Sequence, residues 1–240
     1  MFPIVARERV NFNISSAKPR GFCTAKLIAN KADVIAACAA VYNSGIIWRQ
    51  GTSRENVNSP SVRPIINHLG NEIYSYFNNY KNKKVSQSNF DLTLDTWCCY
   101  FRDALSAVHA TSERNLQAVT YGNAQKLINM TIKYLSCFED YDDYAHLFEH
   151  AHIPIDSIIL RRLKDIYNID NIDYTLDNTD EFRVVSAHYR GISWSSFSQN
   201  DYSNLLNEYR NAEFVLNRLQ GHSFLGAEFF WWSGRDLPVL

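Results

Sequence analysis

Two residues near the middle of the chain, Lys126 and Asp156, have positions that would let an amine and a carboxylate act together. Lys126 begins a run whose apolar residues recur at helical spacing, and a helix N-terminus favours the neutral, nucleophilic amine over the cation. Asp156 follows a proline and precedes a second apolar run, so it is a natural N-cap that stays ionised. Each residue alone is also compatible with a solvated lysine or a simple cap. Together they could supply a nucleophilic amine and an ionised carboxylate to the same reaction.

The order of these residues resembles a known family. The segment Gly122-Asn-Ala-Gln-Lys126, followed by Ile153-Pro-Ile-Asp156 and an apolar-basic helix, is similar to the signature of the helix-hairpin-helix DNA glycosylase superfamily. That signature is a Gly-x-Gly-x-Lys hairpin followed by Pro-Val-Asp. The 30-residue spacing from Lys126 to Asp156 resembles the archaeal 8-oxoguanine glycosylase branch. Ala124 departs from the second glycine, and a left-handed backbone there would cost alanine about 1–2 kcal/mol.

The resemblance implies a role for each part of the motif. Lys126 would attack the sugar and Asp156 would assist, giving base excision with a possible lyase step. A hairpin would bind a DNA phosphate through backbone N–H groups at a helix N-terminus. The hairpin residues implied to bind DNA are Gly122, Asn123, Ala124 and Gln125. The reaction needs no metal and no nucleotide cofactor.

The substrate implied is double-stranded DNA with a damaged or modified base, which must be flipped out of the duplex into a pocket. Among the aromatic residues, 14% of the chain, we choose Trp194 and Trp232 as pocket walls, although such residues are more often core. Asn129 and Gln125 carry amides suited to reading a base edge. The first candidate base is oxidised guanine. A second is a hypermodified base, such as glucosylated hydroxymethylcytosine in phage DNA, excised as antiviral defence.

Two other interpretations stay open. A non-catalytic helical module that binds nucleic acid or protein would use Lys126 only to touch phosphate, and it would tolerate loss of Asp156. A metal site formed by His146, His150 and His152 with Glu149 and Asp156 is the weaker alternative. His146 and His150 share a helical face only if their loop is helical, and no third ligand is assured.

Composition limits the class of protein. The 240 residues, 46% of them hydrophobic, are enough for one sizeable core. The formal net charge of −1 excludes a global field that recruits nucleic acid, so any DNA-binding face is a local patch. The five cysteines lack C-x-x-C spacing and are typical of reduced core thiols. Because no run of apolar residues is long enough for a signal peptide or a bilayer span, we expect a soluble cytoplasmic protein, monomeric by the resemblance.

The elements that would position the site are helices. We expect one mainly α-helical, helix-hairpin-helix glycosylase-like domain over residues 1–240, a single compact unit of two helical lobes with its catalytic segment at 111–167. Apolar periodicity predicts helices over residues 23–42, 72–80, 93–109, 126–138, 156–167 and 193–219. Gly45 would end the first of these helices, and residues 59–70 would form a break before the second. The hairpin would add a short helix over 114–121, and residues 168–181 would form a polar surface loop.

Two further stretches could contact DNA. Trp48, Arg49 and Arg54 could stack on bases or bind phosphates, and a packed tryptophan beside solvated arginines is at least as reasonable. Lys81 to Lys84 could hold a phosphate backbone or form a solvated turn.

Overall fold

Helices account for the regular secondary structure of the chain wherever the computed structural model describes it, with no strand among those residues. The described residues are 26–48, 54–114, 116–157, 159–160, 193–211 and 225. The prediction of a mainly α-helical protein is therefore confirmed at this level. Among the described helices, none is long and apolar enough to cross a membrane.

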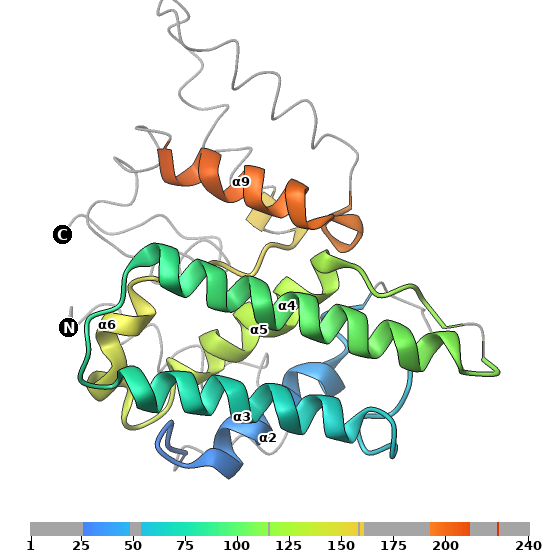
Figure 1. Cartoon of the computed structure of the whole chain (residues 1–240), viewed down its shortest axis with the longest axis horizontal. Coiled ribbons are helices and arrows are strands. Elements are labelled where there is room, and N and C mark those ends of the chain that lie inside the picture. The colour runs from blue at the N-terminus through green and yellow to red at the C-terminus, as the bar shows by residue number, and fades with distance from the viewer. Residues whose placement is uncertain are drawn as a thin grey trace, which may run out of the picture.

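One helix, α5 (Tyr121–Leu135), lies at the centre of the described part of the molecule. It contacts α2 (Lys31–Ser44), α4 (Gln87–Ala110), the 3-10 turn η2 (Trp194–Ser196) and α9 (Gln199–Asn211). Figure 1 shows α5 passing behind the long α4, with α9 above the bundle. Since every residue of α5 is buried, including its polar ones, each polar group there needs a partner inside the protein.

Two glycines define the packing of the first helices. Gly45, with φ of 79°, ends α2 in the left-handed conformation, as the sequence predicts. Gly70 was expected to mark a break, but it lies inside α3 (Arg63–Tyr80), which is longer than the predicted helix over 72–80. A Cβ at Gly70 would approach the Cα of Ile35 in α2 to 2.8 Å. The glycine therefore serves a close approach of α2 and α3.

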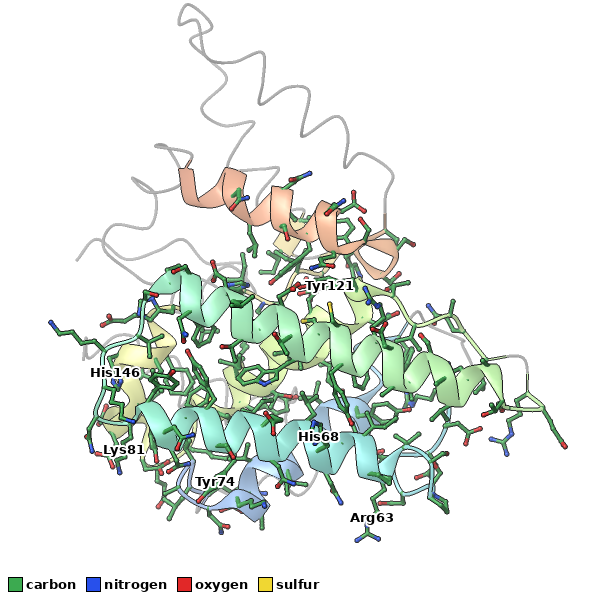
Figure 2. The ribbon with its side chains drawn as sticks, in the orientation of Figure 1. Arg63, His68, Tyr74, Lys81, Tyr121 and His146 are labelled. Atoms are coloured by element: carbon green, nitrogen blue, oxygen red, sulfur yellow. The ribbon has the colours of Figure 1, made fainter. Side chains whose placement is uncertain are left out.

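The helix α4 begins six residues before the predicted boundary at 93. Ser86 is its N-cap, and its hydroxyl accepts the backbone N–H of Asn89 at 3.2 Å. The apolar side of α4 supplies large core side chains, among them Trp97 and Phe101. In Figure 2, α3 with His68 and α4 run side by side across the front of the bundle.

The expected hairpin does not form. Residues 116–120 are irregular rather than helical, and α5 begins at Tyr121, so Gly122 lies within the helix. Thr120 is the N-cap and makes a capping box: its hydroxyl accepts the N–H of Asn123, and the Asn123 side chain accepts the N–H of Thr120. A capped helix start satisfies these groups locally, so the segment needs no preceding helix.

The acidic stretch after α5, residues 139–149, forms two short helical elements. It contains the 3-10 turn η1 (Tyr141–Tyr144) and the short helix α6 (Ala145–Phe148). The Asp140 carboxylate accepts the backbone N–H groups of Ile28 at 2.7 Å and Ala29 at 2.9 Å. Asp140 therefore holds the segment before α2 against the end of α5.

Candidate active site

Polar side chains are concentrated on the buried helix α5. Lys126 is only 4% exposed, and Asn123, Gln125 and Asn129 are fully buried. A helix this buried is usually apolar on every side. Polar groups kept in such a place are either fully bonded for structure or held ready for chemistry.

The structure brings three of the predicted site residues together. The Lys126 ammonium forms an ion pair with Oδ2 of Asp156. The Trp194 ring lies over the same ammonium, with Nζ 5.4 Å from the ring centroid. The Asp156 side chain is 15% exposed, so the pair lies at the edge of the protein interior. There a cation gains from both the carboxylate and the face of the indole.

The Asp156 carboxylate is held by the start of the following helix. Oδ1 of the carboxylate accepts the backbone N–H of Ile159 at 2.9 Å. The backbone carbonyl oxygen of Asp156 accepts the N–H of Leu160 at 2.8 Å. The predicted N-cap role is therefore confirmed. With one oxygen on the helix and the other on Lys126, the carboxylate has a defined orientation.

The residues predicted to bind a DNA phosphate instead form hydrogen bonds within the protein. The Gly122 N–H donates to the Phe197 carbonyl at 3.0 Å, and the Ala124 N–H donates to the Thr120 carbonyl at 3.2 Å. A Cβ at Gly122 would overlap the Trp194 carbonyl oxygen. Gly122 therefore allows the η2 segment to approach, and these N–H groups do not face a phosphate in this conformation.

The side chain of Asn123 is also committed within the protein. Its Nδ2 donates to the Ile47 carbonyl at 2.6 Å, and its Oδ1 accepts the Thr120 N–H at 3.0 Å. Both ends of the amide are used, so the phosphate-binding hypothesis for residues 122–125 has no support from this geometry.

A chain of hydrogen bonds that the sequence did not indicate joins three elements beside the ion pair. The ring of His152 bonds Asp91 through Nε2 at 2.7 Å and the Tyr202 hydroxyl through Nδ1 at 3.0 Å. The Tyr202 oxygen also accepts an N–H of Asn129 at 2.8 Å. The sequence feature that could have indicated this chain of hydrogen bonds is His152, a polar residue among the apolar residues of 151–155.

A second polar contact holds α9 near the start of α5. The Tyr121 hydroxyl donates to Oδ1 of Asp95 at 2.8 Å, and Gln199 donates to both Asp95 oxygens at 2.9 Å. Burial raises the pKa of Tyr121 far above its ordinary value, so the hydroxyl keeps its proton. Figure 2 shows Tyr121 at the end of α5 that faces α9.

The three histidines proposed as metal ligands have separate partners. His146 bonds the Tyr80 carbonyl at 3.0 Å and His150 bonds Gln87 at 3.1 Å, while His152 faces Asp91. Within the described ranges, no group of three or more His, Cys, Asp or Glu side chains is placed to hold a metal ion. The metal-site alternative is therefore not carried further.

The other predicted DNA contacts have structural partners where they are described. Trp48 is buried and stacks on His109, with ring centroids 5.9 Å apart. Arg54 donates to the Asn43 carbonyl at 2.9 Å, and Lys81 pairs with Asp143 at 2.8 Å. Trp232, Arg49 and residues 161–192 lie outside the described residues.

Comparisons with protein families, with curated proteins and with solved structures give no match for this chain.

Proposed function

We propose that this chain is a DNA glycosylase that flips and excises a damaged or modified base, with Lys126 and Asp156 as its catalytic residues. The observation that carries the proposal is the buried ion pair between these two residues beneath the Trp194 ring. The order of the Lys126 and Pro-x-Asp segments, which resembles the helix-hairpin-helix glycosylases, adds support. Lys126 and Asp156 meet although residues 122–125 are helical and form no hairpin.

The chemistry follows from the two groups. Asp156 takes a proton from the Lys126 ammonium, and the freed amine attacks C1′ of the target nucleotide. The bond from C1′ to the base breaks, and the base leaves with the bonding electrons and takes the proton that Asp156 accepted. Positive charge develops on the sugar as the bond breaks, and the carboxylate of Asp156, now deprotonated again, stabilises it. The nitrogen of the amine adduct then gives a proton to O4′ as the sugar ring opens, and the resulting Schiff base allows the lyase step.

Access to Lys126 involves the η2 segment. Trp194 covers the ammonium, and its chain neighbours are fixed to α5 by the Thr120 hydroxyl, which donates to the Ser195 carbonyl at 2.7 Å. A sugar reaches the amine once this segment yields. Trp194 is then the nearest flat surface on which a flipped base can stack.

The first test is borohydride trapping, which fixes a lysine Schiff base to DNA. Duplexes carrying 8-oxoguanine or an abasic site, and phage DNA with glucosylated hydroxymethylcytosine, are incubated with wild type, Lys126→Gln and Asp156→Asn. Lys133 is a second buried lysine on the same helix, so Lys133→Gln is the matched control. Circular dichroism verifies that each variant is folded.

We expect an adduct with wild type and with Lys133→Gln, none with Lys126→Gln, and base release reduced at least about 100-fold in Asp156→Asn. An adduct that disappears only with Lys133→Gln would overturn the assignment of Lys126. Release of free base without an adduct, dependent on Asp156, would indicate a monofunctional glycosylase. Neither signal on any DNA would favour a non-catalytic binding module, in which the ion pair is structural.

A further inference from the structure

Gln125 precedes Lys126 in α5 and is fully buried. Its side chain bonds both the backbone N–H and the backbone carbonyl of one residue, Ile155. Its Nε2 donates to the Ile155 carbonyl at 2.9 Å, and its Oε1 accepts the Ile155 N–H at 3.3 Å. A two-point bond of this kind fixes both the position and the direction of the backbone it holds. Ile155 immediately precedes Asp156.

A neighbour on the same side of α5 determines which way the Gln125 carboxamide points. One turn later, Asn129 donates through Nδ2 to Oε1 of Gln125 at 3.1 Å and to the Tyr202 hydroxyl at 2.8 Å. An N–H group bonds only the oxygen end of an amide, so Asn129 directs the Nε2 of Gln125 toward Ile155. Asn129 and Gln125 therefore form a ladder of amides that ends on the Ile155 backbone.

We propose that Gln125 is a positioning residue, whose carboxamide fixes the Ile155 backbone so that the Asp156 carboxylate meets the Lys126 ammonium. Gln125 and Lys126 are consecutive, so they leave α5 about 100° apart around the helix axis. They therefore hold two consecutive residues, Ile155 and Asp156, from two directions. Both ends of the Gln125 amide bond Ile155, so the prediction that Gln125 reads a base edge is not supported by this geometry.

The kinetic consequence rests on the proposed glycosylase function. Gln125→Met keeps the length of the side chain and removes both bonds to Ile155. The misplaced carboxylate should lower kcat by about 100-fold while KM stays within about twofold, because Gln125 is fully buried and offers no surface to DNA. The matched control is Thr131→Val. It removes another buried polar group of α5, whose hydroxyl donates to the Leu127 carbonyl of the same helix at 2.8 Å. We expect this control to keep kcat.

A second measurement needs no enzymatic activity. An ammonium group buried in an ion pair exchanges its protons slowly, so Lys126 should give its own 1H–15N signal in lysine-labelled wild-type protein. Lys126→Gln identifies this signal by its loss, and Asp156→Asn should remove or shift it. We expect Gln125→Met to change the signal as Asp156→Asn does, and Thr131→Val to leave it in place.

The two measurements separate failure of the positioning role from failure of the proposed function. An ammonium signal in Gln125→Met that matches wild type would overturn the positioning role, whatever the activity. A changed signal without base excision in wild type on any DNA would keep the positioning role and reject the glycosylase.

A milder variant covers the case in which Gln125→Met does not fold. Tyr202→Phe removes a single hydroxyl, which accepts from Asn129 and also bonds His152, and it should produce the same changes to a smaller extent. An unchanged ammonium signal in Tyr202→Phe would then count against the proposal.

Discussion

At the scale of single residues, burial gives Lys126 its importance. An ammonium moved out of water loses several kcal/mol of hydration, which its partners must offset. Here Asp156 and the Trp194 ring provide part of that compensation. The same surroundings limit the number of conformations of the amine, which a nucleophile benefits from.

Removing the cation should therefore be costly for stability. We expect Lys126→Met to lower the free energy of unfolding by about 3 kcal/mol, because the partly buried Asp156 carboxylate loses its counter-ion. Urea denaturation monitored by circular dichroism measures the change. The control is Lys81→Met, whose pair with Asp143 is exposed and should contribute nothing measurable. Equal effects in the two variants would mean that burial does not strengthen the Lys126 pair.

Whether alanine at position 122 raises or lowers the free energy of unfolding tests the packing of η2 against α5. In an exposed helix, replacing glycine by alanine stabilises the protein by about 1 kcal/mol. Here the new Cβ would overlap the Trp194 carbonyl oxygen, so we expect Gly122→Ala to destabilise by about 1–3 kcal/mol and to alter tryptophan fluorescence. Thermal and urea denaturation measure the change. A stabilised variant would show that the η2 segment does not pack against α5.

At the scale of elements, the start of α5 joins two parts of the chain that are far apart in sequence. Thr120 caps the helix, and its hydroxyl also donates to the Ser195 carbonyl of η2. One side chain therefore stabilises the central helix and fixes the segment that carries Trp194.

Because Thr120 has this double role, losing its side chain should cost more stability than losing Ser86, which only caps α4. Ser86→Ala removes the cap of α4 and should cost about 1 kcal/mol. Thr120→Ala loses both a cap and the bond to η2, so it should cost about 2 kcal/mol, whereas Thr120→Ser should retain most of the stability. Urea denaturation of the three variants measures these values. Equal losses in the two alanine variants would exclude a stabilising contribution from the bond to Ser195.

At the scale of the whole molecule, the core holds several ionisable groups in their neutral forms. Burial raises the pKa of Cys38 from 9.0 to about 12, and it raises the pKa of Tyr76 and Tyr134 from 10.0 to about 12. The folded protein therefore holds these protons more tightly than the unfolded chain does. Their contribution to stability is complete below about pH 9 and decreases as the pH rises toward 12.

We therefore expect alkaline unfolding. The melting temperature should be constant from about pH 7 to 9 and fall steadily between about pH 9 and 12. Ionisation of Tyr76 and Tyr134, obtained by comparing the ultraviolet absorbance of wild type with that of Tyr76→Phe and Tyr134→Phe, should accompany unfolding instead of preceding it. Ionisation of either residue in the folded protein near pH 10 would contradict this explanation.

The sequence by itself determined what depends on near neighbours in the chain. Apolar spacing predicted a helix through Lys126, although its start was placed too late, and the residues flanking Asp156 predicted an N-cap. The mainly helical class follows from the same local signals. Gly45 ends α2 as predicted, because a left-handed residue at a helix end favours glycine whatever the rest of the fold does.

Only the tertiary structure decided what the buried groups bind. Gln125 bonds a residue 30 positions away, and His152 bonds Asp91, which is 61 positions away. Gly122 was interpreted as part of a hairpin, yet the feature that requires a glycine is the η2 backbone packed against it. Such partners depend on how distant elements pack, and local spacing carries no information about which of them will meet.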